Sequence, residues 1–315
     1  ADIPENVMDL YRDKPAAQGG TLYGLPPDSN CQLQYYRVDV LEQAGISKPA
    51  DTWDEAIEIA KELSAGGQNQ TGTTLRRGLF AGGVFITLLR SHGGDWFDKM
   101  EPGGWNPQLN SEAGSMAMDV LLALKPYLEP TSLNASDDEA NPAMATGVWT
   151  YAPVQWGGTT MNDPEFTEFH EVWKSTIVPR GSNPEGRHAP HMGGLGLLIP
   201  TYSKNKEAAW EFVKFCCSGD TQDPRIGQAW VEGTGQPARI SLLRKYADVR
   251  PHFQALMESL PHSVRYLPIP ETNALYEAVG NEVAAVMTGD KDKEAALRDM
   301  DASVRQIMQD AGYYD

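Results

Sequence analysis

The chain has 315 residues, 41% of them hydrophobic, and its 43 acidic residues against 26 basic ones give a net charge of −17. That excess of negative charge excludes the basic surface that nucleic acid requires, and it is equally unsuited to an anionic membrane surface. No run of about 18 apolar residues occurs, so the sequence predicts no membrane-spanning helix. The length is sufficient for two domains, each with its own core.

Helices are predicted where apolar residues recur every three or four positions. The first is opened by a capping box formed by Thr52 and Glu55 and extends to about Leu63. Two segments, 32–40 and 194–199, have the composition of strands, the second a buried one. Strands separated by helices indicate an α/β protein. The remaining predicted helices are 111–125, 206–218 with Asn205 as its cap, 275–288 closed by Gly289, and 297–308.

No catalytic, cofactor or metal site is predicted. His188 and His191 lie three residues apart, but Pro190 separates them and no cysteine or further histidine is near. The chain contains neither a nucleophile elbow nor a glycine-rich loop for phosphates. We therefore expect a protein that is not an enzyme. The three cysteines are predicted to be unpaired thiols: Cys31, Cys216 and Cys217.

Aromatic residues are numerous in loops that are rich in Gly and Pro. A flat apolar ring flanked by polar groups suits a sugar ring, and the alternative for each residue is packing in a small side core. The loop aromatics are Trp96, Trp105, Trp149, Tyr151 and Trp156.

Four stretches share their order and spacing with one protein family. They are GTLYGLP at 20–26 with LQYYRVDVL at 33–41 and KPADTWDE at 48–55; GGDWFD at 93–98 with NSEA at 110–113; AMATGVW at 143–149; and GGLGLLIP at 193–200, running on through SKNKEAAWEF at 203–212 to GQPAR at 235–239. From about residue 20 to its end the chain resembles the extracellular solute-binding proteins of carbohydrate ABC importers, the family 1, maltose-binding-protein-like group. Arg37 departs from the family, which usually has Asn there.

The resemblance implies a two-lobed α/β clamp, the type II periplasmic-binding-protein or Venus-flytrap architecture. Solute would bind in the cleft between the lobes, and the closed form would dock on the permease subunits of an ABC importer. Residues 1–30 and 193–235 would form a remnant of the N-terminal lobe, and residues 31–192 and 236–315 would form the C-terminal lobe. Family members carry a further segment before the GTLYGLP stretch, so the first lobe is expected to be incomplete.

The resemblance also implies a periplasmic or extracytoplasmic location. The first six residues have neither the basic nor the apolar stretch of a signal peptide, which we expect to be absent from this chain or already removed. An incomplete first lobe would leave part of the apolar stripe of helix 205–218 exposed, with Trp210, Phe212 and Phe215 in it. The sequence therefore predicts self-association through that lobe.

Three aromatic residues are expected to contact solute because of the positions they hold in the resemblance. Trp149 and Tyr151 follow the Ala143-Met144 stretch, where the family places cleft residues, and they would stack on a sugar. Tyr276 stands where maltose-binding relatives carry a cleft aromatic. The alternative for each ring is a place in the core.

Four further residues would bind the solute through polar groups. Asp28 and Arg239 are candidates for binding hydroxyl groups, although Asp28 could instead cap a turn and Arg239 could hold a helix end. Gly193 and Gly194 would let backbone N–H groups approach a ligand closely.

The predicted function is therefore binding of a mono- or oligosaccharide and its delivery to an ABC permease, without catalysis, metal or cofactor. An alternative is a protein of the same fold for a non-sugar solute such as a polyol or a small anion. A glycoside hydrolase fragment is the remaining alternative.

Overall fold

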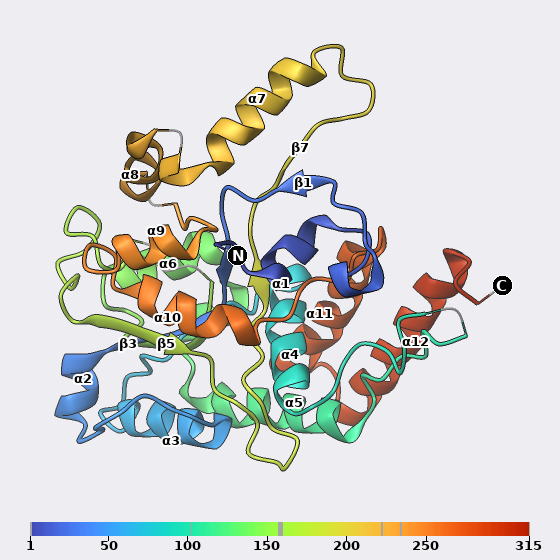
Figure 1. The fold of residues 1–315 in the computed structure, drawn as a ribbon. Helices are drawn as coiled ribbons and strands as arrows, with labels where there is room; N and C mark the ends of the chain where they lie inside the picture. The colour runs from blue at the N-terminus through green and yellow to red at the C-terminus, as the bar shows by residue number, and fades with distance from the viewer. Residues whose placement is uncertain (1, 102, 157–159, 222, 234, 315) are drawn as a thin grey trace. The chain divides into compact units, whose positions relative to one another are not determined.

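The computed structural model describes residues 2–101, 103–156, 160–221, 223–233 and 235–314 (Figure 1). The chain forms two compact units. Unit 1 consists of Ala1–Leu33, Trp156–Ile177 and Pro190–Pro268, and unit 2 of Gln34–Gln155, Val178–Ala189 and Ile269–Asp315. Both parts of the predicted N-terminal remnant, 1–30 and 193–235, fall within unit 1, which also takes in 156–177 and 236–268. The assignment of lobes in a clamp stays a prediction.

Unit 2 is built around α4 (Leu79–Ser91), whose residues from 81 to 91 are buried on every side. Helix α11 (Thr272–Thr288) packs along α4, as Figure 1 shows, and α5 (Glu112–Leu124) contacts the same helix. Helix α12 (Lys293–Asp310) packs on α11, and α3 (Trp53–Leu63) packs on α5. The core of unit 2 is therefore a layer of helices around one buried, mainly apolar helix.

Two glycines set the distance between α4 and α11. A Cβ added to Gly280 would lie 1.8 Å from the carbonyl oxygen of Gly78, and one added to Gly82 would lie 2.3 Å from the carbonyl oxygen of Tyr276. The two helix backbones touch at this crossing, which no residue with a side chain would permit.

The predicted helices of unit 2 are confirmed. The capping box is present, since Thr52 accepts from the N–H of Glu55 and the Glu55 carboxylate accepts from the N–H of Thr52. Gly289 ends α11 in the left-handed conformation, with φ of 88°. Helix α4 escaped prediction because a helix that is apolar all round has no 3.6-residue period to detect.

The strands of unit 2 are shorter than predicted. Strand β3 (Leu33–Arg37) lies beside β4 (Tyr151–Gln155) in one sheet. The expected strand 32–40 is wrong at its end, because the chain turns into α2 (Val38–Gln43) after Arg37. Arg37 binds the carboxylate of Asp39 in the first helical turn, with Nη2 2.6 Å from Oδ2. Helix α6 (Asp137–Ala145) completes the unit.

Unit 1 contains two short antiparallel ribbons, β1 (Gly24–Leu25) with β7 (Leu197–Leu198) and β2 (Asn30–Cys31) with β6 (Met192–Gly193). The prediction of a buried strand at 194–199 is wrong: only residues 197 and 198 form a strand, and Leu198 is 57% exposed. The other elements of unit 1 are α1 (Glu5–Met8), β5 (Trp173–Ile177), α7 (Lys206–Cys217), α8 (Pro224–Glu232), α9 (Ile240–Lys245) and α10 (His252–Ser259).

Asn205 occupies the cap position of α7 but makes no capping hydrogen bond through its side chain. The three cysteines are unpaired, as predicted. Among the residues that the structure describes, no helix combines the length and the apolar character that crossing a bilayer would need.

Candidate functional site

The ribbon β2–β6 organises the most distinctive polar and aromatic cluster of unit 1. Asn30 pairs with Gly193 across the ribbon. On its other side β6 continues against a second segment, since the N–H of Met192 donates to the carbonyl of Val264 at 2.9 Å and that of Val264 donates to Pro190 at 2.9 Å. Segments far apart in the sequence are therefore held in register by backbone hydrogen bonds.

This pairing assembles an aromatic row of three rings, Trp156, His191 and Tyr266. The centre of the His191 ring lies 4.1 Å from that of Tyr266 and 5.7 Å from that of Trp156. His191 is buried, whereas Trp156 and Tyr266 are only half-buried, so both outer rings keep part of their surface accessible. Partly exposed aromatic faces beside polar groups are suited to the C–H surfaces of a polyhydroxylated solute.

Asn30 adds a hydrogen-bond acceptor to the aromatic row. Its Oδ1 is buried and has no hydrogen-bond partner among the described residues. A Cβ added to Gly193 would lie 2.3 Å from this oxygen and 2.9 Å from Cζ3 of Trp156. The absence of a side chain at Gly193 is therefore what allows the amide and the indole to lie over β6. A buried acceptor without a donor costs about 1–3 kcal/mol, so this oxygen would be stabilised by any hydrogen-bond donor.

Asp28 and Gly194 lie next to this cluster. Burial raises the pKa of Asp28 to about 6, against the opposing effect of hydrogen bonds from the backbone N–H groups of Gln236 and Leu195. Gly194 has φ of 141°, and a Cβ there would lie 3.0 Å from the carbonyl oxygen of Asp28 and 3.3 Å from the hydroxyl of Tyr11. That Tyr11 hydroxyl is buried and has no hydrogen-bond partner among the described residues. The structure thus brings together Asp28, Gly193 and Gly194, three of the predicted residues.

Arg239 belongs to the same unit but is occupied elsewhere. Its Nη1 lies 3.0 Å from the Asp2 carboxylate, and its Nε donates to the carbonyl of Cys217 at 2.9 Å. The guanidinium therefore links Asp2 to the end of α7. This is the structural role, holding a helix end, that the sequence offered as the alternative to binding a solute hydroxyl.

Trp149 and Tyr151 are core residues of unit 2, which corrects their prediction as stacking groups. Both are 0% exposed. The Trp149 indole lies against the backbone of Gly72, and its Nε1 donates to Glu129 at 3.1 Å. The Tyr151 hydroxyl donates to the side-chain oxygen of Gln34 at 3.1 Å. Neither ring has a face that a solute could reach.

Tyr276 is a core residue as well. It is 0% exposed within α11, and its ring meets that of Trp96 edge to face with centres 5.0 Å apart. The prediction that Tyr276 contacts solute is therefore corrected too. A sequence position alone does not tell which side of a helix a ring occupies.

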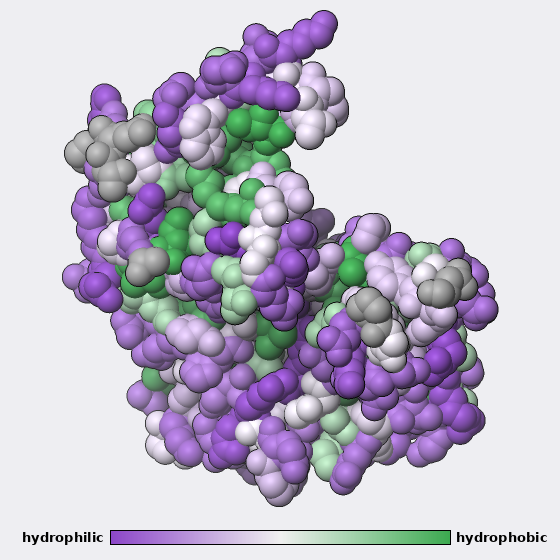
Figure 2. Space-filling view, turned by 45° about the vertical axis from the view of Figure 1, so that its right-hand side comes forward, coloured by the Kyte–Doolittle hydropathy of each residue, from purple (hydrophilic) through white to green (hydrophobic). Residues whose placement is uncertain are grey.

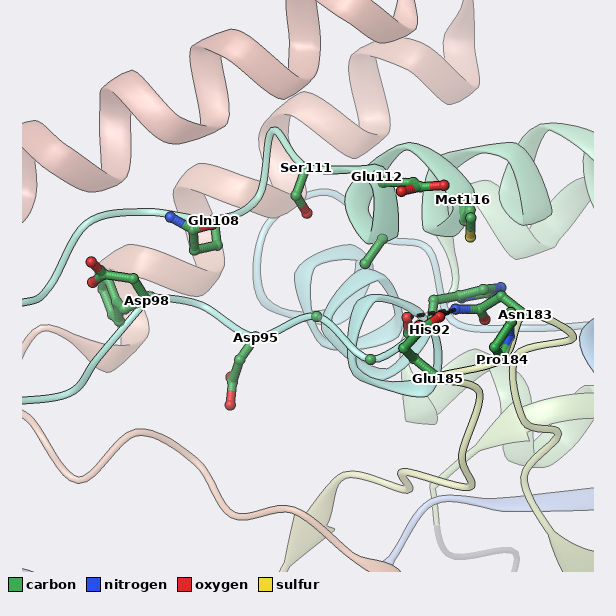
Figure 3. A pocket seen from close by; sticks show the side chains of 14 residues that line it. His92, Asp95, Asp98, Gln108, Ser111, Glu112, Met116, Asn183, Pro184 and Glu185 are labelled. Carbon is green, nitrogen blue, oxygen red and sulfur yellow. Dashed lines mark hydrogen bonds between the residues drawn. The ribbon is translucent and has the colours of Figure 1, made fainter.

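Unit 2 carries a separate surface pocket of about 520 Å³ (Figure 3). Figure 3 shows Asp95 and Asp98 on one loop, Glu112 at the start of α5, and Glu185 on a third segment. The pocket is thus lined by four carboxylates and by no Lys or Arg.

Two of these carboxylates already bind other groups of the protein. Asp95 accepts from Nε of the buried Arg90 at 3.1 Å. Asp98 accepts from the side chain and the backbone of Asn106, and these bonds lower its pKa. In the described ranges no three His, Cys, Asp or Glu side chains gather as metal ligands. The benzene ring in its lining, Phe97, is buried, so the pocket presents no phenyl face to a solute, whereas Trp156 and Tyr266 keep part of theirs accessible. The cluster of unit 1 is therefore the better candidate site.

Sequence reasoning identified Trp156 as a loop aromatic but not as a member of a site, and it missed Asn30, His191 and Tyr266. The available signal was the glycine pair at 193–194, since a glycine in a strand marks a close approach to another group. The contact with Tyr266 depends on pairing across some seventy residues, for which the sequence holds no local signal.

The comparisons with known proteins agree on one protein family. A sequence profile described as "bacterial extracellular solute-binding protein" matches residues 2–222. The mannitol-binding protein of Pseudomonas aeruginosa is 27% identical over 98% of this chain and 74% of its own length. A probable amino-acid ABC transporter periplasmic-binding protein of Sinorhizobium fredii is 25% identical over 99% of this chain and 69% of its own length.

Similarity to a solved structure shows the fold. An ABC transporter solute-binding protein of Agrobacterium vitis, with bound D-mannitol, superposes with a TM-score of 0.80 at 20% identity, covering 99% of this chain and 77% of that one. The expected two-lobed α/β fold of periplasmic binding proteins is therefore confirmed. The profile spans more than two thirds of the sequence, and the chain belongs to the family of bacterial extracellular solute-binding proteins.

Proposed function

We propose that this protein binds a small neutral polyhydroxylated solute, a sugar or a polyol, and delivers it to the permease of an ABC importer. The observation that carries the proposal is the aromatic row with the unpartnered Oδ1 of Asn30 beside it. Of the similar proteins described above, one is named for mannitol and one has mannitol bound, and this supports polyols as solutes beside the sugars expected from the sequence.

The chemistry of the cluster favours a neutral solute. The C–H faces of such a solute would pack on Trp156 and Tyr266, and one hydroxyl would donate to Asn30. None of these side chains carries a permanent positive charge, so the cluster offers no counter-ion to the small anion considered as an alternative.

We further propose that the protein is not an enzyme and that it works outside the cytoplasm, where an importer's binding protein meets its solute. Family membership supports both statements. The names of the relatives, which include ABC transporter binding proteins, support the permease as partner. Self-association, expected from the sequence, stays a prediction.

Titration calorimetry with mannitol, maltose and a neutral amino acid tests the function. We expect binding of the polyol or the sugar and none of the amino acid. Trp156→Ala should weaken binding by roughly 1–3 kcal/mol, or about 5- to 150-fold in Kd, from the aromatic area lost. Asn30→Ala should weaken it by about 1 kcal/mol.

Trp210→Ala is the matched control, because Trp210 belongs to unit 1, lies outside the cluster and is 44% exposed. Binding of mannitol or maltose that is unchanged by Trp156→Ala and Asn30→Ala would reject the cluster as the site. Binding of the amino acid alone would reject the function.

A further inference from the structure

A second hollow of unit 2 adjoins the pocket shown in Figure 3. It has a volume of about 330 Å³ and is bordered by α3 and α5. His92, Met116 and Asn183 line both hollows, which therefore form one groove along α5. Figure 3 shows Met116 reaching from α5 toward His92 and Asn183. We name this the α5 groove; its lining, all of it in unit 2, includes Asp54, Ile57, His92, Glu112, Met116 and Ala123.

The floor of the α5 groove is an apolar strip of α5. Ala113, Met116, Val120 and Ala123 line it, and their spacing of three and four residues is that of one side of a helix. Ile57 of α3 adds to the strip. Met116, Ala123 and Ile57 are only half-buried, so the strip is accessible. From Ala113 to Ala123 it measures about 15 Å at 1.5 Å per residue, which is nearly three helical turns.

The border of the α5 groove is acidic. Four carboxylates line the first hollow and two, Asp54 and Asp119, line the second, and among the described residues neither Lys nor Arg lines either. Arg90 neutralises Asp95, and Lys293 neutralises Asp119 with Nζ 2.7 Å from the carboxylate. The other four carboxylates make no ion pair within the described part of the chain: Asp54, Asp98, Glu112 and Glu185.

His92 adds a hydrogen-bond acceptor between the two hollows. Its Nδ1 lies 2.8 Å from the carbonyl oxygen of Leu88, which can only accept, so Nδ1 carries the proton and Nε2 holds a lone pair. Burial lowers the pKa of His92 and so keeps the ring neutral. His92 is only 7% exposed, yet it lines both hollows, and its Nε2 has no hydrogen-bond partner among the described residues. Carboxylates and this nitrogen only accept, so the groove suits a partner with positively charged donors.

Other occupants suit the α5 groove less well. In the described ranges no three His, Cys, Asp or Glu side chains gather as metal ligands, so a metal ion would lack a site. A second copy of the chain would bring the same net charge of −17 and be repelled. Figure 2 shows a mainly hydrophilic surface with small apolar patches at the height of α3 and α5 in Figure 1. A partner therefore has to combine apolar surface with positive charge.

We propose that the α5 groove binds a basic amphipathic helix of a partner protein. The apolar side of that helix would cover Ile57 and Met116, as in other complexes where a helix lies in a hydrophobic groove. Lys or Arg beside that side would pair with Asp54 and Glu112, and one of their N–H groups would donate to Nε2 of His92. Opposite charges also speed the encounter at low ionic strength. In the proposed function this partner is the permease, and only that identification rests on the proposed function.

Fluorescence anisotropy of a labelled peptide tests the α5 groove. The probe is a short helix-forming peptide with leucines along one side and lysines beside them, and its control has glutamates in place of the lysines. The wild-type chain should bind the lysine peptide, more weakly as NaCl rises from about 0.02 M to about 0.3 M, and should not bind the glutamate peptide. Met116→Lys should weaken binding by at least about tenfold, and Asp54→Asn combined with Glu112→Gln by at least about fivefold.

The combination of Glu62→Gln and Glu294→Gln is the matched control. Both side chains are exposed carboxylates of unit 2 outside the lining of the groove, and the two changes remove the same net charge. Glu294 lies in the first turn of α12 as Glu112 lies in the first turn of α5, so the effect on the helix dipole is matched too. This variant should bind the lysine peptide like the wild type. Circular dichroism should show all variants folded.

A wild-type chain that does not bind the lysine peptide at low salt would overturn the proposal. Equal losses in the two double variants would do the same, because net charge alone would then explain the binding. Self-association of the wild type that Met116→Lys abolishes would make a second copy the occupant and also reject the proposal. A chain that binds the peptide but no sugar or polyol would reject the proposed function and leave the groove assignment standing, and the reverse result would reject the groove alone.

Discussion

Replacing Trp149 by Ala should destabilise unit 2 and leave solute affinity almost unchanged. The indole is 0% exposed and lies flat on the backbone of Gly72, whose added Cβ would fall 1.8 Å from Cδ2 of the ring. Burying about 200 Å² at about 25 cal/mol per Å² contributes on the order of 5 kcal/mol, and this is an upper estimate. Measured losses for Trp→Ala in cores are about 3–5 kcal/mol.

Trp149 also donates a hydrogen bond to Glu129, which adds about 1 kcal/mol. Trp149→Phe separates the two contributions, because it keeps most of the contact with Gly72 and loses the N–H. We expect Trp149→Phe to cost well under half as much as Trp149→Ala. For a domain stable by about 5–15 kcal/mol, a loss of about 3–5 kcal/mol is between roughly a fifth and the whole of its stability.

Urea unfolding followed by far-UV circular dichroism measures the stability change, and calorimetry on the folded variants measures solute affinity. Circular dichroism is preferable to fluorescence because the chain has eight tryptophans, of which the mutation removes one. If Trp149→Ala unfolded within about 0.5 kcal/mol of the wild type, as a surface substitution would, and solute bound about tenfold more weakly, the core assignment would be refuted.

Two titrations in unit 1 should act in opposite directions between about pH 4 and 6. Burial holds the pKa of His252 at about 3, so acidification below its ordinary 6.5 protonates only the unfolded chain and lowers stability by up to about 1.4 kcal/mol per pH unit. The Asp28 pKa of about 6 exceeds its ordinary 3.8, so stability from Asp28 is complete below 3.8 and is lost as pH rises through 6. Urea unfolding at pH 4.5 and 7 should therefore show Asp28→Asn losing more stability on acidification than the wild type, and His252→Phe losing less; identical profiles for all three proteins would contradict both assignments. Gly280→Ala should destabilise unit 2 because its Cβ would overlap the carbonyl of Gly78, whereas Gly83→Ala, with nothing within 4 Å of an added Cβ, should be neutral or stabilising by up to about 1 kcal/mol. Equal melting temperatures for the two glycine variants would refute the close crossing of α4 and α11.

Much of the fold could be predicted because its outer helices are amphipathic. Helices α3, α5, α11 and α12 each turn one apolar side to the core, and a period near 3.6 residues reveals such a side. Helix α4 is apolar on every side from Leu79 to Ile86 and so leaves no period there. The strands are poorly predicted for a different reason: β1, β2, β6 and β7 have two residues each, too few to alternate between faces.

The candidate site could be predicted only in part, because burial is decided by tertiary contacts. Trp149 and Trp156 both follow the Ala-Met stretch and both lie near Gly or Pro, yet one is wholly buried and the other half-buried. Trp149 precedes β4 and its indole fills the space that Gly72 leaves open, whereas Trp156 follows the same strand and lies beside Gly193. In both cases a distant glycine determines where the ring lies, and no local pattern connects the glycine to its tryptophan.

The ribbon β2–β6 shows how so short an element can build a site. In an antiparallel pair, two opposite side chains normally share the space above the strands. Opposite Asn30 there is only Gly193, so that space is left to the amide of Asn30 and the ring of Trp156. The backbone hydrogen bonds of β6 to Val264 then bring Tyr266 alongside His191. A single residue without a side chain thus lets groups from four separate segments converge, and these groups combine apolar faces with an acceptor that still lacks a donor. A solute that offers C–H surfaces and hydroxyl groups together would satisfy both requirements, which is why we propose polyols and sugars rather than charged or purely apolar molecules.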